Sequence, residues 1–340
     1  MTTFNKQELL TKFNLVKSSI AKNSTINALN NLFISVSNNE FKLIGCNGEL
    51  QVTAKGSCTG NESFSACADP ATFGVMLSAA KEDVQISLQD GKLKTISARS
   101  KFNIPTIPGD MYPLIQSDEE INNNINIGEI IRHVYKAAPK VDVRTMLIGT
   151  CVEYDGEKLT AVATDGTIMI TSRIDAKFES EKFSIIIPSQ AAAFFASTDI
   201  DGFVVSNKSI TATSEQNNTE IISKLIDARY PDWKRIVSDY QYKFTVNKEQ
   251  LKNAVSIINK TDKVSASFKS NNYSMSVYCD GVNTDIDFEG NEFNNSYDPG
   301  KLLTCIDAID SDKMEFSFDG RGWLQSQHNG VRFFIAPMRK

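Results

Sequence analysis

The sequence offers few side chains that could carry out catalysis. Its two histidines, His133 and His328, are far apart, and it has no P-loop, nucleophile elbow or dinucleotide-binding fingerprint. Asp165 could act as an acid, but the Asp-Gly pair that it begins is typical of a turn. The six cysteines are dispersed without a C-x-x-C pair, so they are interpreted as small buried side chains in a reducing cytoplasm. The sequence therefore predicts a protein that is not an enzyme and holds no metal or cofactor.

One chemically mixed stretch is a better candidate for a binding role. The segment Ile226–Val237, IDARYPDWKRIV, places Trp233, two cations and two β-branched residues after a Tyr-Pro pair. Its apolar groups could line a cleft, and Arg235 would supply a directional donor. A packed connector between domains is the alternative, because Pro231 restricts the preceding residue to extended conformations.

Composition sets the outer limits of the fold. At 340 residues the chain is long enough for two or three domains, and its hydrophobic content of 41% is that of an ordinary globular protein. No apolar run approaches the roughly 18–20 residues that cross a bilayer, and the N-terminal stretch lacks the apolar core of a signal peptide. We therefore expect a cytoplasmic protein without a membrane partner. The net charge of −5 argues against a surface that is basic throughout, although a local basic face would still be compatible with it.

An internal repeat organises the chain. The segments FNKQELL, INIGEII and VNKEQLK share a pattern, and their asparagines Asn5, Asn126 and Asn247 are each 121 positions apart. Each asparagine is a candidate N-cap for an amphipathic helix. A second helix is expected after Pro70, after Pro188 and after Pro299.

Alternating apolar runs between these helices predict strands, and pairs such as Asp90-Gly91 predict hairpin turns. The Tyr-Pro pairs Tyr112-Pro113 and Tyr230-Pro231 are 118 positions apart, where each of the first two units ends. The pattern predicts an α+β fold of three similar domains, with bounds at 1–117, 118–240 and 241–340.

Three motifs in the expected order, VATDGTIMI at 162–170, RYPDWKRIV at 229–237 and the terminal IAPMRK, resemble the bacterial-type sliding clamps, the β subunits of replicative DNA polymerases. The resemblance covers essentially the whole chain. It implies three tandem copies of the clamp domain in each chain, with helices lining a channel and antiparallel sheets outside. Two chains would join head to tail into a ring. The ring would encircle duplex DNA and tether the replicative polymerase, with a clamp loader and other motif-bearing proteins as further partners.

The resemblance also implies where DNA would pass. Weak phosphate contacts suit a sliding ring, because strong ones would oppose movement. Cations on the first helix of each repeat would face the DNA, and a solvated helix face is the alternative for any one of them. The expected DNA-facing residues are Lys12, Lys17, Arg132, Lys136, Lys252 and Lys260.

In the clamp family, partner proteins insert a short hydrophobic peptide between the second and third domains. Matching the motifs onto this sequence gives a pocket in which aliphatic and Met walls adapt to inserted side chains. The expected pocket residues are Leu147, Thr164, Gly166, Thr167, Ile168, Met169, Pro231, Arg235, Ile236, Ile335, Ala336, Pro337, Met338 and Arg339. Trp233 is expected to pack as a core residue that joins the two domains, while Arg235 and Ile236 face Met169 and Met338.

The sequence departs from the family pattern around this pocket. Thr167-Ile168-Met169 stands where the family usually has His-Arg-Leu, and Thr145 and Met146 replace frequent aromatic residues. At the terminus, Ala336 and Lys340 stand where larger apolar residues are common. These changes alter the expected peptide preference and remove one family DNA contact. They would suit a divergent member of the family, such as one encoded by a phage.

Ring closure gives a further expectation. Ile257 and Ile258 end the first helix of the third repeat, near the boundary between subunits that the resemblance implies. We expect that the domain's own core does not need at least one of these side chains, which would then be free to contact the other subunit. The alternative is that both are buried within the domain. A repetitive β-rich structural or adhesive protein without DNA function is the competing interpretation of the whole chain.

Overall fold

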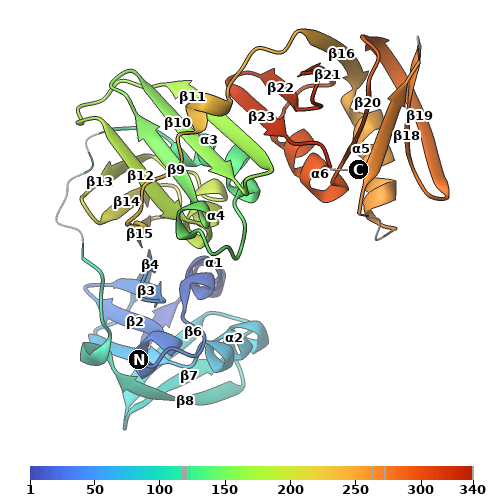
Figure 1. Cartoon of the computed structure of the whole chain (residues 1–340). Helices are drawn as coiled ribbons and strands as arrows, with labels where there is room; N and C mark the ends of the chain where they lie inside the picture. The colour runs from blue at the N-terminus through green and yellow to red at the C-terminus, as the bar shows by residue number, and fades with distance from the viewer. Residues whose placement is uncertain (117–120, 122, 262–263, 272, 339–340) are drawn as a thin grey trace. The chain divides into compact units, whose positions relative to one another are not determined.

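The computed structural model describes residues 1–116, 121, 123–261, 264–271 and 273–338 (Figure 1). The chain divides into two compact units. Unit 1 comprises Met1–Asn126 and Asp199–Lys224, and unit 2 comprises Ile127–Thr198 and Leu225–Lys340. The predicted boundary at 117/118 and the expected pocket residue Arg339 lie outside the described residues.

Unit 1 is built on one antiparallel sheet. Its described strands follow the order β1-β6-β7-β8-β5-β2-β3-β4-β15-β14-β13, and β1 also pairs with β4. The predicted turn between β6 and β7 forms, with positive φ at both Asp90 and Gly91, as a two-residue hairpin favours. The strands are β1 (Thr2–Phe4), β2 (Leu32–Ser37), β3 (Glu40–Cys46), β4 (Leu50–Thr59), β5 (Phe64–Ala68), β6 (Val84–Gln89), β7 (Lys92–Ser97), β8 (Ser100–Pro108), β13 (Gly202–Val205), β14 (Ser209–Ser214) and β15 (Thr219–Lys224).

Unit 2 contains a second antiparallel sheet. Its described strands follow the order β12-β9-β10-β11-β23-β22-β21-β16-β19-β18-β17-β20. The pairing of β11 with β23 joins segments that are far apart in sequence, with Met169 opposite Phe334. The strands are β9 (Gly149–Tyr154), β10 (Lys158–Thr164), β11 (Ile168–Asp175), β12 (Phe183–Pro188), β16 (Tyr242–Asn247), β17 (Ala266–Ser270), β18 (Ser274–Cys279), β19 (Val282–Gly290), β20 (Asn294–Tyr297), β21 (Lys313–Phe318), β22 (Leu324–His328) and β23 (Val331–Ile335).

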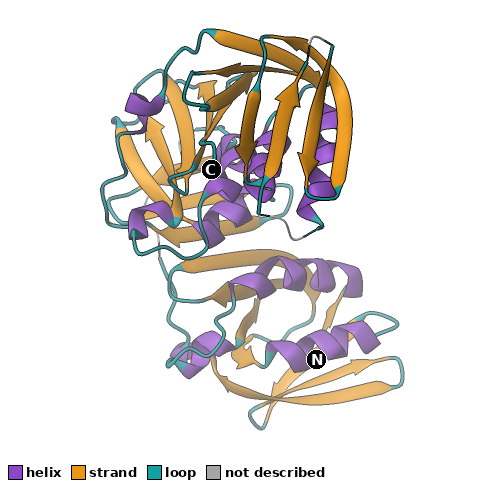
Figure 2. Ribbon diagram, turned by 45° about the vertical axis from the view of Figure 1, so that its right-hand side comes forward, coloured by secondary structure: helices purple, strands orange, loops and turns teal. Residues whose placement is uncertain are grey.

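The α-helices occur at the predicted places and pack against strands of their own unit (Figure 2). In unit 1, α1 contacts β3 and β4 so closely that a Cβ on Gly45 would lie 2.2 Å from the carbonyl oxygen of Val16. In unit 2, α3 packs on β10 and β11, and His133 Nδ1 lies 3.0 Å from the carbonyl oxygen of Ala308 at the end of α6. The α-helices are α1 (Lys6–Val16), α2 (Pro70–Ala79), α3 (Ile127–Val134), α4 (Ser189–Ala196), α5 (Lys248–Asn259) and α6 (Pro299–Ala308).

Single turns of 3-10 helix complete the described elements. They are η1 (Lys17–Ser19), η2 (Asn27–Asn30), η3 (Gly109–Met111), η4 (Tyr135–Ala137), η5 (Thr145–Leu147) and η6 (Trp233–Ile236). The last of these falls in the mixed segment Ile226–Val237. No described helix is long and apolar enough to span a membrane.

Two of the three predicted asparagine caps form. Asn5 accepts a hydrogen bond from the backbone N–H of Glu8, and Asn247 accepts one from that of Gln250, both at 3.0 Å. The side-chain oxygen of Asn126 is buried and, among the described residues, has no hydrogen-bond partner. The expected cap at Asn126 is therefore wrong, although helix α3 does begin at Ile127, the next residue. A mixture of helices and antiparallel strands, as the sequence predicted, is confirmed.

Candidate functional site

An apolar cluster lies where β11 pairs with β23. Met169 is 2% exposed and packs with Leu147, Tyr230 and Phe334, while Trp233 contributes a partly buried side chain. We call this set, which also includes Cys151, Val162 and Ile186, the Met169 cluster. The predicted residues Leu147 and Met169 are thus brought together, and they come from η5 and β11.

Strand register separates two other predicted residues from this cluster. Ile168 pairs with Ile335, one position along from the pair formed by Met169 and Phe334. Because successive side chains point to opposite faces of a sheet, Ile168 and Ile335 lie on the face away from Met169. Both are buried there, and neither belongs to the Met169 cluster. Sequence reasoning missed Phe334, and the period-2 alternation through Val331, Phe333 and Ile335 is the signal that would have assigned it to the opposite face.

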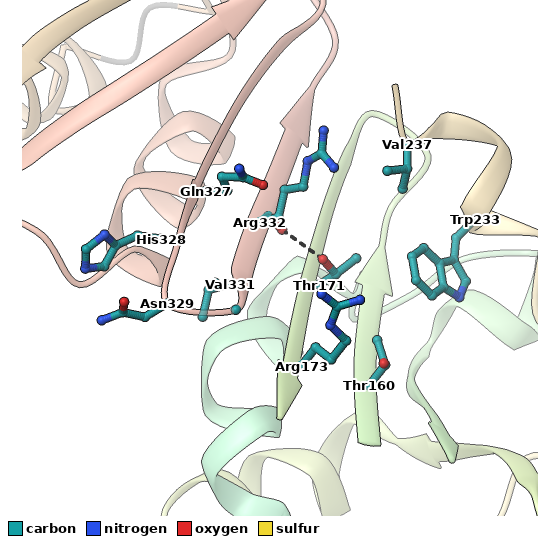
Figure 3. A pocket seen from close by; sticks show the side chains of 11 residues that line it. Thr160, Thr171, Arg173, Trp233, Val237, Gln327, His328, Asn329, Val331 and Arg332 are labelled. Atoms are coloured by element: carbon teal, nitrogen blue, oxygen red, sulfur yellow. Dashed lines mark hydrogen bonds between the residues drawn. The ribbon is translucent and has the colours of Figure 1, made fainter. Parts of the chain in front are cut away.

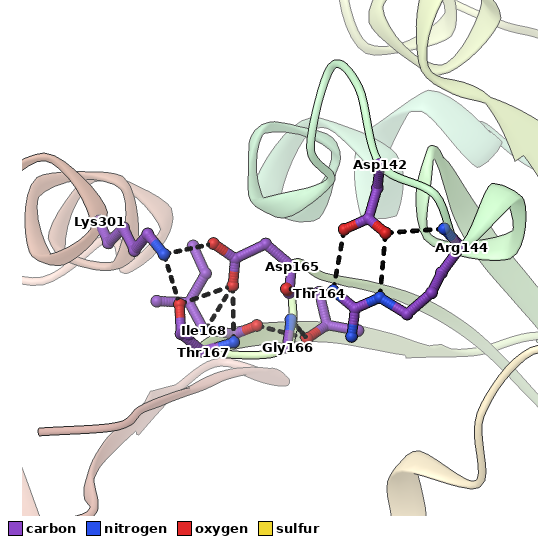
Figure 4. Close-up of polar contacts among 8 residues, drawn as sticks. All are labelled: Asp142, Arg144, Thr164, Asp165, Gly166, Thr167, Ile168 and Lys301. Atoms are coloured by element: carbon purple, nitrogen blue, oxygen red, sulfur yellow. Dashed lines mark hydrogen bonds and ion pairs between the residues drawn. The ribbon is translucent and has the colours of Figure 1, made fainter.

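The Asp165-Gly166 turn is fixed by a dense polar network (Figure 4). Asp165 accepts hydrogen bonds from the backbone N–H groups of Thr167 and Ile168 and forms an ion pair of 2.8 Å with Lys301. Lys301, on α6, also donates to the hydroxyl of Thr167. Burial raises the pKa of Asp165, but the hydrogen bonds outweigh it and hold the pKa below its ordinary value. Asp165 is thus an ionised structural anchor and not a catalytic acid.

The turn is held from its other side by an arginine. Arg144 donates to both carboxylate oxygens of Asp142, and its Nη2 also reaches the carbonyl oxygen of Asp165 at 3.1 Å. The hydrogen bonds from Arg144 lower the pKa of Asp142 to about 2. Gly166 has φ of +92°, and a Cβ there would lie 3.1 Å from the Arg144 guanidinium. These contacts explain why a glycine stands in the turn.

The mixed segment lies over the sheet through its tryptophan. Trp233 packs on the Met169 cluster, and its indole N–H lies 3.4 Å from Glu153. Lys234 forms an ion pair with the same carboxylate and stands over the Trp233 ring. Arg235 is exposed and pairs with Asp232, and Ile236 is 41% exposed. Trp233 packs on the cluster but is only partly buried, so it is not the fully buried core residue that was expected, and Arg235 and Ile236 do not belong to the Met169 cluster.

The end of the described chain follows β23 across the same region. Ala336 donates from its backbone N–H to the carbonyl oxygen of Thr167, and Met338 donates to that of Ser296, both at 2.8 Å. Pro337 and Met338 are half-buried, and Pro231 is exposed. Thr164 contributes its hydroxyl to the turn, donating to the carbonyl oxygen of Ile168.

A cavity of about 420 Å³ opens beside the Met169 cluster (Figure 3). Trp233 belongs to both, because its ring packs on the cluster and also lines the cavity. Sequence reasoning did not identify this cavity. Its walls consist of Thr160, Thr171, Arg173, Trp233, Val237, Gln327, His328, Asn329, Gly330, Val331 and Arg332.

The predicted DNA-facing cations differ in their exposure and in whether they form ion pairs. Lys17, Arg132, Lys136 and Lys260 are exposed. Lys252 forms a 2.7 Å ion pair with Asp307. Lys12, by contrast, is only 9% exposed and donates to the carbonyl oxygen of Asn217, so it is not among the exposed cations. Burial lowers the pKa of Lys12.

The two isoleucines expected at the subunit boundary face opposite ways. Ile257 is 48% exposed, whereas Ile258 is fully buried in the core that α5 covers. The placement of Ile258 in an interface is therefore wrong, since its side chain already has its contacts within unit 2. Ile257 remains available, as expected for at least one of the pair.

Two family models match the sequence. The N-terminal domain of the DNA polymerase III β subunit matches residues 2–116, and its central domain matches residues 121–232. Together these ranges cover about two thirds of the chain. A match of this kind is contrary to the competing interpretation of a repetitive structural or adhesive protein.

Individual relatives of the sequence are also β sliding clamps. A β sliding clamp of Streptococcus pneumoniae is 24% identical over 348 residues, covering 93% of this chain and 92% of the relative. A β sliding clamp of Pseudomonas aeruginosa is 26% identical over 274 residues, covering 75% of this chain and 72% of the relative.

Solved structures share the fold. A Pseudomonas aeruginosa sliding clamp bound to griselimycin superimposes with a TM-score of 0.90 at 20% identity, covering all of both chains. A Bacillus subtilis sliding clamp gives 0.89 at 17% identity, covering all of this chain and 99% of that one. Fold, motifs and family models agree: this chain belongs to the bacterial-type β sliding clamps, the family of the DNA polymerase III β subunit.

Proposed function

We propose that this protein is a DNA sliding clamp that encircles duplex DNA and tethers the replicative polymerase for processive synthesis. As a member of the clamp family it acts as a processivity factor and not as an enzyme. The match of two β-subunit domain models over about two thirds of the chain is the observation that carries this proposal.

Each chain would contribute three domains, 1–117, 118–240 and 241–340, and two chains would close head to tail into a ring. The matched ranges of the two family models support the first two domains. The recurrence of paired helices, α1 with α2, α3 with α4 and α5 with α6, supports the third. Ile257, exposed on α5, would lie at the contact between subunits.

Exposed cations on the first helix of each repeat would guide the DNA. Lys17, Arg132, Lys136 and Lys260 are exposed on or just after these helices, in a chain whose net charge is −5. Scattered cations give weak, salt-sensitive phosphate contacts, which allow movement along the duplex. Retention would come from ring topology.

Partner proteins would bind the Met169 cluster through a short apolar peptide. A Helicobacter pylori β clamp of the same fold, with a TM-score of 0.88 at 14% identity, was solved with a DNA ligase peptide. Polymerase, clamp loader and other motif-bearing proteins would use the same surface. The partly buried Trp233, which packs on this cluster, and the half-buried Met338 would offer apolar walls to such a peptide.

Retention on DNA tests the proposal. Clamp loaded by its loader onto nicked circular DNA should remain bound in moderate salt and leave once the circle is cut, because a ring slides off free ends. An electrostatic binder would instead lose affinity with salt on both forms. Equal retention on circular and linear DNA would reject the clamp function.

A further inference from the structure

The cavity beside the Met169 cluster has a marked charge. Its lining includes the guanidinium groups of Arg173 and Arg332, and no carboxylate is among the lining residues. Trp233 and Val237 supply apolar walls, while threonine and glutamine side chains add hydrogen-bonding groups. A cavity with this lining favours a ligand that carries a negative charge.

Arg173 is the cation free to bind such a ligand. Its side chain is exposed, and within the described part of the chain no carboxylate forms an ion pair with it. Its backbone N–H is bonded to the carbonyl oxygen of Gly330, which fixes the position of β11 there. Figure 3 shows the Arg173 side chain extending between Thr171 and Thr160, toward Trp233.

Arg332 is held differently. Its guanidinium donates to Gln325 and to the carbonyl oxygen of Ser238, and it stacks over the ring of Phe334 at 4.9 Å. Burial lowers the pKa of Arg332, although the guanidinium remains charged. Arg332 also lies 3.8 Å from the exposed carboxylate of Asp239, which partly balances its charge. Arg173 is therefore the lining cation that has no carboxylate partner among the described residues.

The cavity continues the surface proposed for partner peptides. Met169, Thr171 and Arg173 alternate along β11, so their side chains share one face of the sheet. At about 3.3 Å per residue, the Cα atom of Arg173 lies roughly 13 Å from that of Met169. An extended peptide covers this distance in about four residues.

We propose that Arg173 binds an acidic side chain of the partner peptide, about four residues from its apolar anchor, in the cavity lined by Trp233, Thr171 and Arg332. The planar guanidinium matches a carboxylate with two parallel hydrogen bonds. This inference rests on the proposed function, since the anchor occupies the Met169 cluster. The acidic residue would set which partners bind more tightly, because the cavity repels a cation at that position.

Two labelled peptides test the inference by fluorescence polarisation. Both carry the apolar anchor of the cognate replicative polymerase followed by five residues, with either Glu or Gln at the fourth. The full-length clamp should bind the Glu peptide about fivefold more tightly than the Gln peptide, the range of a partly exposed charge pair. Arg173→Gln should remove the difference, and Arg173→Lys should restore only part of it.

Matched variants separate the two proposals. Arg99→Gln removes the same charge from an exposed site in unit 1 and should preserve the fivefold preference. Met338→Ala should weaken both peptides equally. If wild-type clamp binds both peptides with one affinity, the Arg173 site is rejected while the peptide surface stands; if it binds neither, both are rejected. An Arg173→Gln variant that keeps the preference but binds duplex DNA more weakly would assign Arg173 to phosphate and overturn the inference.

Discussion

Met338 should separate peptide binding from folding. Its side chain is half-buried, and its only described hydrogen bond uses the backbone N–H, which donates to Ser296. Met338→Ala keeps that bond and removes an adaptable apolar wall. Because a few anchors dominate such sites, we expect partner-peptide affinity to fall by about 2 kcal/mol, or roughly thirtyfold. Fluorescence polarisation with a polymerase peptide measures this.

Deleting Pro337–Lys340 is the companion to that substitution. The bond from Ala336 to Thr167 remains, so β23 should keep its place on β11. We expect the deletion to abolish peptide binding but to leave the dimer and its DNA retention intact. Unchanged peptide affinity after the deletion would show that the tail does not take part in the site.

The Lys301–Asp165 pair should make stability depend on pH. Asp165 has a pKa below that of an unfolded aspartate, about 3.9, so its contribution is present above that pH and is lost as pH falls through the lower folded value. Lys301→Met should cost about 1 kcal/mol at pH 7, since the pair is partly exposed. Thermal melts at pH 7 and in acid should show this loss shrinking as pH falls below the unfolded pKa of about 3.9. A loss that is the same at both pH values would exclude the ion pair as its cause.

The sequence indicated which residues belong to the site more readily than it indicated the directions in which their side chains point. The family resemblance assigned Leu147, Met169 and Trp233 to this region, and the three do pack together. Strand register decides whether Phe334 or Ile335 faces the site, because a shift of one residue turns each side chain to the other face of the sheet. The burial of Lys12 depends on the carbonyl group of Asn217, some two hundred residues away, which no local pattern reveals.

Helix caps give a test among equivalent elements. Asn247 accepts the hydrogen bond of a formed cap on α5, whereas the buried Asn126 oxygen before α3 has no described partner. Asn247→Ala should lower the free energy of unfolding by about 1 kcal/mol. Asn126→Ala should cost less or even stabilise, because it removes an unpaired buried polar group. Chemical denaturation of the two variants compares them, and an equal loss would mean that Asn126 also caps its helix.

Helix α5 provides a matched pair for ring closure. Ile258→Ala opens a cavity in the core and should cost about 2–4 kcal/mol of stability. Ile257→Ala should leave the melting temperature nearly unchanged, because its side chain is 48% exposed, yet weaken the dimer. Sedimentation velocity at several protein concentrations measures the association of the two subunits. If Ile257→Ala leaves the dimer equally stable or makes it tighter, the contact between subunits does not involve Ile257.

The element order was predictable because the repeat carries its own landmarks. Equal spacing of three asparagines, prolines at the starts of the second helices and Asp-Gly turns all have local causes. The pairing of β4 with β15 and of β11 with β23 has no such signal, since it joins strands from different repeats. The β11–β23 pairing positions the site, so its neighbourhood could be expected from sequence only through the family resemblance.

Comparison of these two strand pairings shows an asymmetry in the chain. Gln51 on β4 occupies the position that Met169 has on β11, since each stands 61 residues before the Tyr of the following Tyr-Pro pair. The Gln51 amide donates to the carbonyl oxygen of Ile115 and accepts from its N–H, at 2.9 and 2.8 Å. This pair of bonds holds the connector against the sheet. At β11 the corresponding side chain is an apolar methionine with no such bonds to Trp233.

We therefore expect one partner peptide per chain. An apolar anchor entering beside Gln51 would break two hydrogen bonds and leave a buried amide unpaired, which costs about 1–3 kcal/mol for each unsatisfied group. The same anchor packing beside Trp233 over the Met169 cluster would break no such side-chain hydrogen bond. Isothermal titration with a polymerase peptide should give one site per chain, or two per proposed dimer, and Met338→Ala should weaken all of the binding with no unaffected fraction. Four sites, or a residual class insensitive to Met338→Ala, would show that the β4–β15 pairing also binds peptides and that Gln51 does not exclude them.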